Sequence, residues 1–390
     1  MIAEWMRSKF ELSRHMSNGN VRPMEGLRGL AIFLVFIAHF SPMMDAWIQP
    51  GTALAKFAWI VLPIGRAGVD LFFVLSGYLI YGSLIGRAQP FVPFMKRRVQ
   101  RIYPVFLAIF AVYLFLSWRF PGESKIPSGM PDALAYIGAN VLLLPGMLPI
   151  KPLMSAAWSL SYEFFYYLTI PVLVGAFALR AKSVHWRLGF FVAIVLVGAL
   201  VSLRYGGYVR LLMFIAGVLL YEVTHHRLFR AAPGAVLAVA LVLGFVSTQT
   251  LEEDPVGMVV RLAGLFVAFF LLCHTCFTVP DSVFTRFFSW TPLRWLGNFS
   301  YSYYLAHGLA LKTGFTVLRK VVPPHPQGPG FYVVMMAVMF CWTLVPSVFV
   351  FLFVERPFSL APKRGVKKSV DAQPPVDPES VSLANAPAAD

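Results

Sequence analysis

The chain has 390 residues, of which 58% are hydrophobic and only 13% carry a charge. Its mean hydropathy is +0.69, and soluble domains hold about twice this share of charged residues, so the composition excludes an ordinary soluble domain and predicts a polytopic membrane protein. The net charge of +15 does not indicate a nucleic-acid partner, because Lys and Arg gather at the ends of apolar segments, where the positive-inside rule places them.

Residues 1–21 are predicted to form a cytoplasmic N-terminal segment. The first 25 residues mix basic and acidic side chains and contain no apolar core followed by a cleavage site. We therefore expect no removable signal peptide and a first helix that inserts as an anchor.

The apolar runs predict an all-α fold with about ten transmembrane helices. The runs lie near residues 27–43, 68–85, 102–118, 163–179, 187–203, 208–223, 233–249, 257–277, 295–318 and 331–354. A further run at 133–149 is interrupted by Pro145, Gly146 and Pro149, which predicts one extra short or re-entrant helix.

The distribution of basic residues favours ten crossings. If residues 133–149 do not cross and the N-terminus is cytoplasmic, 22 of the 33 Lys and Arg lie at the cytoplasmic side. If that run does cross, the division becomes 17 against 16. The positive-inside rule therefore predicts that both termini are cytoplasmic.

In the first apolar helix, Arg28 and His39 lie eleven positions apart, which returns to nearly the same helix face. Ionisable side chains at membrane depth are costly, so two on one face indicate a polar track into the bilayer. Alternatively, Arg28 is an interfacial anchor and His39 is a packing residue.

Two carboxylates begin later predicted helices. Asp70 opens the second helix and Glu163 opens the fourth, and with His39 they are predicted to share a layer near the outer face. A carboxylate that accepts from one imidazole nitrogen raises the basicity of the other, as a general base requires. Alternatively, Asp70 is a helix cap and Glu163 is an interfacial charge.

The loop at 86–101 is rich in cations and precedes the third predicted helix. It carries Arg87, Lys96, Arg97, Arg98 and Arg101. Cations beside a helix N-terminus can hold phosphates by charge and by bidentate Arg contacts. The alternative is that the cluster only sets topology or touches anionic lipid.

Further polar and aromatic residues accompany these groups. Trp158 and Tyr162 suit a wall that stacks on sugars, although an interfacial aromatic belt explains them equally well. Ser300, Tyr304 and His307 lie on one helical side. None of the eight histidines pairs convincingly with another by spacing, so we expect no metal site. The three cysteines lie in apolar segments and give little support for a disulfide framework.

Six sequence blocks in order resemble the acyltransferase-3 family of integral membrane proteins, over about residues 22–357. Their order is Arg28 with His39, GVDLFFVLSGYLI with Asp70 and Ser76, RVQR at 98–101 followed by Tyr103-Pro104, WSLSYEFFYY with Glu163, LGNFSYSYYLAHG, and Glu355-Arg356-Pro357. Residues 22–357 are thus the expected membrane acyltransferase domain. Residues 358–390, basic at first and then rich in Pro, Ala and Ser, are expected to form a disordered cytoplasmic tail. The chain resembles the stand-alone form that lacks a fused hydrolase-like domain.

The resemblance implies a bacterial inner-membrane enzyme that moves an acyl group, usually acetyl, from cytoplasmic acyl-CoA to a sugar hydroxyl. Acyl-CoA would be a co-substrate, and no bound cofactor is expected. Arg98 and Arg101, with Arg97, would hold donor phosphates, and Arg28 would guide the pantetheine arm. His39 would take the proton of the acceptor hydroxyl, with Asp70 or Glu163 orienting it. The acceptor, lipid-linked or part of a surface glycan, and the oligomeric state are not determined by the sequence.

Two other readings stay open. In a proton-coupled transporter, His39, Asp70 and Glu163 would form a proton relay and the basic loop would only set topology. A non-catalytic membrane scaffold would leave the polar helix faces unexplained.

Overall fold

The structure, a computed structural model, describes residues 2–12, 21–205, 209–249 and 254–360. Within these residues the regular structure is helical, with no β-strand, as predicted. The main helices are α1 (Ile2–Phe10), α2 (Val21–Met43), α3 (Ala53–Ile85), α4 (Phe91–Arg119), α5 (Met130–Val141), α6 (Ala157–Ala176), α7 (Val184–Tyr205), α8 (Leu212–His225), α9 (Gly234–Ser247), α10 (Pro255–Thr278), α11 (Val283–Phe288), α12 (Thr291–Asn298), α13 (Ser300–Val321) and α14 (Pro329–Val350). Four 3₁₀ turns, η1 (Asp45–Trp47), η2 (Pro121–Glu123), η3 (Leu179–Ala181) and η4 (Val209–Leu211), join them, and a π-helix, η5 (Phe351–Ser359), continues α14. The tail predicted to be disordered lies, from residue 361 onward, outside the described residues.

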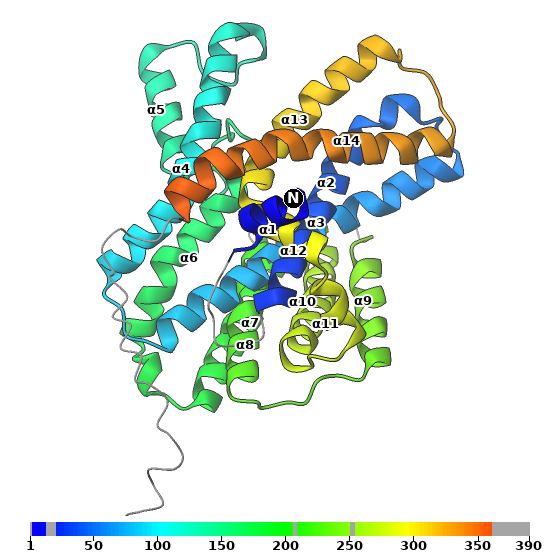
Figure 1. Cartoon of the computed structure of the whole chain (residues 1–390). Coiled ribbons are helices and arrows are strands. Elements are labelled where there is room, and N and C mark those ends of the chain that lie inside the picture. Colours follow the sequence, from blue (N-terminus) through cyan, green and yellow to red (C-terminus); the bar gives the residue numbers. More distant parts are fainter. Residues whose placement is uncertain (1, 13–20, 206–208, 250–253, 361–390) are drawn as a thin grey trace, which may run out of the picture.

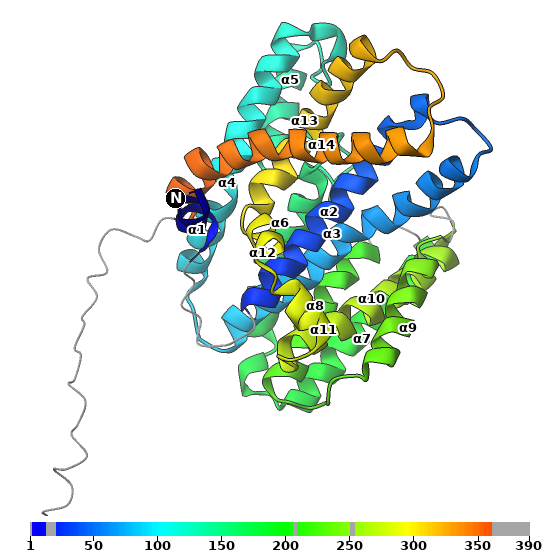
Figure 2. The ribbon, with the colours of Figure 1, turned by 45° about the vertical axis from the view of Figure 1, so that its right-hand side comes forward.

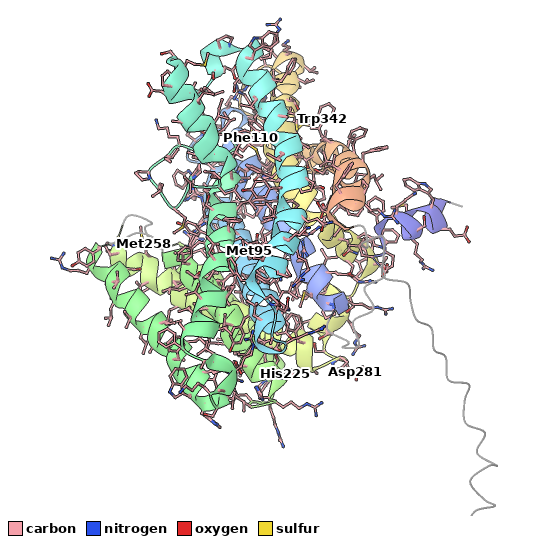
Figure 3. All side chains as sticks on the ribbon, turned by 90° about the vertical axis from the view of Figure 1, so that its left-hand side faces the viewer. Met95, Phe110, His225, Met258, Asp281 and Trp342 are labelled. Carbon is pink, nitrogen blue, oxygen red and sulfur yellow. The ribbon has the colours of Figure 1, made fainter. Side chains whose placement is uncertain are left out.

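The helices form a bundle around a central pair. Helices α2 and α3 lie side by side through the middle, and α3 also packs against α8 (Figures 1 and 2). Helices α9 and α10 form a second pair and α13 and α14 a third, with α14 lying across one face of the bundle. Figure 3 shows the side chains between the helices, with Phe110 and Trp342 toward one end of the bundle and His225 and Asp281 toward the other.

Glycines allow α3 to approach its neighbours closely. A Cβ on Gly65 would lie 2.6 Å from the backbone nitrogen of Ala38, and one on Gly68 would lie 2.4 Å from the carbonyl oxygen of Ala31. Small residues at helix contacts are typical of membrane bundles, where van der Waals packing replaces hydrophobic burial as the driving force. This contact holds the polar middle of α3 against the His39 end of α2.

Six helical segments among the described residues are long and apolar enough to cross a membrane. They are Arg22–Met43, Ala53–Ile85, Phe91–Arg119, Val184–Tyr205, Pro255–Thr278 and Pro329–Ser359. Helices α8 and α9 are apolar but have only 14 residues each. Helices α6 and α13 have 20 and 22 residues but carry more polar side chains. The predicted number of about ten transmembrane helices is therefore not confirmed.

The second predicted span begins much earlier than expected. Helix α3 starts at Ala53, where the Thr52 hydroxyl accepts a hydrogen bond from the backbone nitrogen of Ala55 at 3.3 Å. Residues 53–67 are mostly apolar and continue the helix through Pro63. Asp70 therefore lies inside α3, and the interpretation of Asp70 as a helix cap is wrong.

The interrupted run at 133–149 contains one short helix. Helix α5 has 12 residues, about 18 Å at 1.5 Å per residue, against a hydrocarbon core of about 30 Å. Gly146 follows it with a positive φ of 96°, and a Cβ there would lie 2.7 Å from the carbonyl oxygen of Trp158. Glycine thus lets this turn pack on the start of α6.

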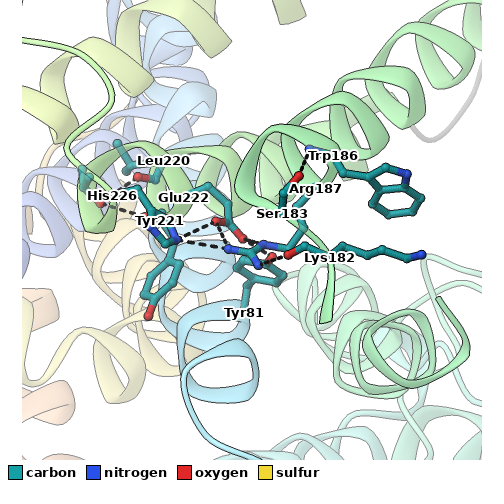
Figure 4. Close-up of polar contacts among 10 residues, drawn as sticks. Tyr81, Lys182, Ser183, Trp186, Arg187, Leu220, Tyr221, Glu222 and His226 are labelled. Atoms are coloured by element: carbon teal, nitrogen blue, oxygen red, sulfur yellow. Dashed lines mark hydrogen bonds and ion pairs between the residues drawn. The ribbon is translucent and has the colours of Figure 1, made fainter. Parts of the chain in front are cut away.

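A buried ion pair and one further hydrogen bond join α3, α7 and α8 (Figure 4). Arg187 of α7 donates from Nε and Nη2 to the two carboxylate oxygens of Glu222 of α8, at 2.6 and 2.7 Å. Tyr81 of α3 also donates to Glu222. Two parallel charge-assisted bonds fix orientation as well as proximity. The network holds α7 and α8 against the half of α3 that follows Asp70.

Candidate active site

Two cavities lie along the bundle and share a wall. The His39 cavity, about 610 Å³, is bounded by α2, α3, α6, α8, α10 and α13, by η4 and by the segment before α6. The Glu163 cavity, about 150 Å³, is bounded by α2, α3, α4, α6 and α13. Val69 and Tyr304 line both cavities. On α2, Arg28 lines the Glu163 cavity and His39 lines the other, so the polar face of this helix passes both.

His39 is oriented by its own helix. Its Nδ1 lies 2.9 Å from the carbonyl oxygen of Val35, one turn earlier. A carbonyl can only accept, so in the neutral ring Nδ1 carries the proton and Nε2 is the basic nitrogen. The expectation that Asp70 or Glu163 orients the ring is wrong, because the backbone already satisfies the nitrogen that a carboxylate would have bonded.

Asp70 is buried and faces a cation in the His39 cavity. Its Oδ1 lies 3.9 Å from Nε of Arg210 in η4. The Arg210 guanidinium lies over the Trp158 ring, 5.7 Å from its centroid. Asp70, Arg210 and Trp158 thus form one polar and aromatic side of the cavity.

Glu163 lies in the other cavity, so the predicted layer of His39, Asp70 and Glu163 does not form. The Glu163 carboxylate accepts from Tyr167 at 2.6 Å and from Ser76 at 3.3 Å. Helix α6 begins at Ala157, six residues before Glu163, so Glu163 does not open the helix. Helical spacing then turns Trp158 and Tyr162 toward one cavity and Glu163 toward the other.

A second histidine lies against His39. The rings of His39 and His307 are 4.9 Å apart between centroids and meet edge to face. Nδ1 of His307 lies 2.7 Å from the carbonyl oxygen of Tyr304, and its Nε2 is buried with no hydrogen-bond partner among the described residues. Spacing along the sequence gives no sign of this contact, because the packing of α2 on α13 brings together residues that are remote in sequence.

The predicted donor-binding cations have different surroundings. Arg28 donates to the Ser300 hydroxyl at 2.7 and 3.1 Å. Arg98 lies over the rings of Phe94 and Tyr167, 5.1 and 5.3 Å from their centroids. Both arginines line the Glu163 cavity, together with Ser76, Ser300 and Arg101.

Arg97 does not line this cavity. It is exposed and bonds to Gln89. Residues adjacent in a helix point about 100° apart, so Arg97 and Arg98 cannot both face the interior. The structure thus separates two neighbouring arginines that the sequence grouped together.

Arg101 is held by a residue that sequence reasoning left out of the site. Its Nη1 lies 2.6 Å from the carboxylate of Glu355, which is fully buried in η5. Glu355 also accepts from the backbone nitrogen and the hydroxyl of Ser302, at 3.1 and 2.6 Å. The Glu355-Arg356-Pro357 block in the sequence was the signal that could have identified Glu355 as part of the site.

Three further cations were missed. Arg66, Arg210 and Arg261 line the His39 cavity, from α3, η4 and α10. A charged residue inside an apolar run was the available signal at Arg66 and Arg261. Their convergence on one cavity depends on the packing of separate helices.

A family model described as an acyltransferase domain, that of the acyltransferase-3 family, matches residues 23–348. The chain belongs to the acyltransferase-3 family. This agrees with the predicted membership, and with the apolar helices it identifies a membrane protein. The match includes both cavities but ends before Glu355.

Relatives that this chain resembles have names that describe acyltransferases. The O-acetyltransferase OatA of Staphylococcus aureus (strain NCTC 8325 / PS 47) is 27% identical over 73% of this chain and 49% of its own length. The Peptidoglycan O-acetyltransferase OatA of Listeria monocytogenes is 28% identical over 74% and 49%, and the Acyltransferase MdmB of Streptomyces mycarofaciens is 31% identical over 38% of each chain. The chain spans about half the length of the OatA relatives it matches. No solved structure matches it significantly.

Proposed function

We propose that the protein is a membrane O-acyltransferase that moves an acetyl group from acetyl-CoA to a hydroxyl of a sugar-containing acceptor. The observation that carries this proposal is the pair of adjoining cavities. One has an oriented imidazole, His39, and the other has Arg28, Arg98 and Arg101. A base in one cavity and cations in the adjoining cavity suit acyl transfer from a phosphate-bearing donor to a polar acceptor.

The donor would enter at the Glu163 cavity. Arg98 lies over two aromatic rings near the start of α4, where it would meet a phosphate of the donor. Arg28 lies deeper, against Ser300, and would meet the amide and carbonyl groups of the pantetheine arm. The thioester would then reach the wall formed by Val69 and Tyr304.

The transfer step needs one base and good alignment. Nε2 of His39 takes the proton of the acceptor hydroxyl as its oxygen attacks the thioester carbonyl carbon. The new C–O bond forms, the C–S bond breaks, and the CoA thiolate takes the proton back from the imidazolium. A thiol is a good leaving group, so positioning supplies most of the advantage. His307 would steady the His39 ring from its edge.

The acceptor side fits a sugar. Trp158 and Tyr162 line the His39 cavity, and aromatic rings suit contact with the apolar face of a sugar. The name of the Listeria relative gives its acceptor as peptidoglycan, which supports a glycan for this chain too. The proton-relay alternative has less support, because His39 contacts neither carboxylate and Glu163 belongs to the other cavity.

The proposed orientation is ten crossings by α2, α3, α4, α6, α7, α8, α9, α10, α13 and α14 in the bacterial inner membrane, with both termini cytoplasmic. Helix α5 would not cross. This orientation puts the start of α4, with Arg98, on the cytoplasmic side, where acyl-CoA is made, and the His39 cavity toward the outer face.

The test uses the full chain in lipid nanodiscs with acetyl-CoA and a crude glycan acceptor. We expect CoA release that depends on the acceptor, and acetylated product. His39→Ala should lower the transfer rate by about 10² to 10⁴ while leaving CoA affinity unchanged. His325→Ala, on an exposed loop, is the matched control. An enzyme that retains more than half its rate without His39 would refute this role.

A further inference from the structure

The described side chains that line the His39 cavity carry more positive than negative charge. Arg66, Arg210 and Arg261 line it from three separate elements. Among the described residues that line it, Asp70 is the one carboxylate. Arginine stays protonated in proteins, so the described side chains of the lining sum to two net positive charges when His39 is neutral. Positive charge concentrated in a hollow with low-dielectric walls attracts anions strongly.

The hydrogen-bonding character of the lining points the same way. A guanidinium offers five donors and no acceptor. No Asn, Gln or Glu belongs to the described lining, whose side-chain oxygen acceptors are the Asp70 carboxylate and the hydroxyls of Ser155, Tyr162 and Tyr304. Sugar hydroxyls both donate and accept, so a neutral sugar needs acceptors as well as donors around it. An ionised carboxylate or phosphate only accepts, and it matches the guanidinium groups of Arg66, Arg210 and Arg261.

The positions of two guanidinium groups are constrained. Arg210 lies over Trp158 and 3.9 Å from Asp70. Arg261 is buried and donates from Nη2 to the carbonyl oxygen of Pro63 at 3.3 Å. Held in this way, arginines lose little side-chain entropy when they bind a ligand. Arg210 and Trp158 together form a place where a sugar ring can stack beside a charged substituent.

We propose that the acceptor is an anionic sugar, one that carries a carboxylate or phosphate near the hydroxyl that is acylated. This rests on the proposed function and adds the acceptor's chemical class to it. The oxyanion would lie among Arg66, Arg210 and Arg261, and the ring would lie beside Trp158. The hydroxyl would then face His39, and the cavity of about 610 Å³ has a size typical of small-molecule sites.

The test measures sugar binding without any acyl donor. The protein in nanodiscs is titrated with methyl glucoside, methyl glucuronide and glucose 6-phosphate, and binding is followed by saturation-transfer NMR. We expect the charged sugar to bind at least tenfold more tightly than methyl glucoside. Comparison of the glucuronide with the phosphate shows which oxyanion the cavity prefers. Equal binding of the charged and neutral sugars would overturn the proposal.

Variants then show which residues cause the preference for charged over neutral sugars. Arg210→Gln and, separately, Arg66→Gln should each remove most of the charged-over-neutral preference. Arg204→Gln is the matched control, because Arg204 is exposed near the end of α7 and does not line the cavity. If a cavity variant fails to fold, the wild-type comparison and the other variant still decide. A preference unchanged in both cavity variants would place the anion elsewhere and overturn the proposal.

Acetyl transfer separates this inference from the proposed function. Acetylation of neutral and charged sugars at equal rates would defeat the anionic-acceptor proposal and leave the acyltransferase proposal standing. Selective binding of charged sugars with no acetyl transfer to them or to the glycan would defeat the acyltransferase proposal and leave the preference for anionic sugars standing.

Discussion

At the scale of single residues, side chains that are neighbours in sequence have different surroundings. Arg98 lies over the rings of Phe94 and Tyr167 at the Glu163 cavity, whereas Arg97 is exposed and bonds to Gln89. In the same way, Tyr162 faces one cavity and Glu163 the other. Adjacent helical positions differ by about 100°, so a cluster of like residues in a helix contributes only part of itself to any one site.

Arg98 and Arg97 therefore give a matched pair of variants. Arg98→Gln should weaken acetyl-CoA binding about tenfold or more, since a charge-assisted contact contributes about 1.5–3 kcal/mol. Arg98→Lys should restore it only in part, because an ammonium lacks the guanidinium fork. Arg97→Gln should change it less than about twofold. Calorimetric titration of CoA into the purified variants measures this, and equal effects at both positions would contradict the assignment.

At the scale of helices, two kinds of contact set the positions of the cavity walls. Glycines permit close approach, as where α3 meets α8: a Cβ on Gly77 would lie 2.0 Å from the carbonyl oxygen of Phe214. Buried ion pairs fix registration, as Arg101 of α4 does with Glu355 of η5. A π-helix is common at functional sites, and here it presents Glu355 to both α4 and α13.

Gly77→Ala should destabilise the bundle. The added methyl group meets backbone, which cannot move away as a flexible side chain would, and overpacking costs about 1–3 kcal/mol or more. For Gly77→Ala we expect a clearly lower temperature at which half of the detergent-solubilised protein has aggregated. Size-exclusion chromatography of heated samples measures this temperature. Gly189→Ala on α7 is the control, because a Cβ there meets nothing within 4 Å. Equal stability of the two variants would argue against the close contact of α3 with α8.

Variants of the Arg101–Glu355 pair distinguish a structural role of Arg101 from a role in donor binding. Glu355→Leu alone should cost at most about 3–5 kcal/mol, because it leaves a partly buried guanidinium without its carboxylate. Arg101→Met with Glu355→Leu should recover much of that stability. CoA affinity of the stable double variant then decides: a normal affinity assigns Arg101 to structure, and a tenfold loss assigns it to the donor as well. A double variant less stable than Glu355→Leu would contradict the pairing.

At the scale of the whole molecule, the two cavities place the proposed donor and acceptor sites at different depths of one bundle. Cations that line the Glu163 cavity come from the starts of α2 and α4, and those of the His39 cavity come from the opposite side of the bundle. A donor and an acceptor could thus approach from different faces without sharing an entrance. Orientation in the membrane then decides which face supplies which substrate.

Site-directed labelling tests that orientation. In a background in which the three cysteines are replaced, a cysteine at Glu253 should react with an impermeant maleimide on intact spheroplasts. One at Ser183 should react only after lysis, since the ten-crossing arrangement gives the larger excess of cytoplasmic Lys and Arg. The opposite pattern would make residues 133–149 a full crossing.

The sequence by itself determined the helical membrane class, the family blocks, and the face of α2 that carries Arg28 and His39. These follow from local properties: apolar length, residue spacing along one helix, and short motifs. Boundaries were less secure, because α3 begins at Ala53 and continues through Pro63 and Arg66, which interrupt the apolar run in the sequence.

Only the tertiary structure decided which faces meet. It brought His307 against His39, moved Glu163 away from Asp70, paired Arg101 with Glu355, and gathered three arginines around one cavity. The physical reason is that helical periodicity fixes directions within a helix but not the rotation and approach of one helix relative to another. That approach depends on glycine contacts and buried ion pairs between residues far apart in the chain.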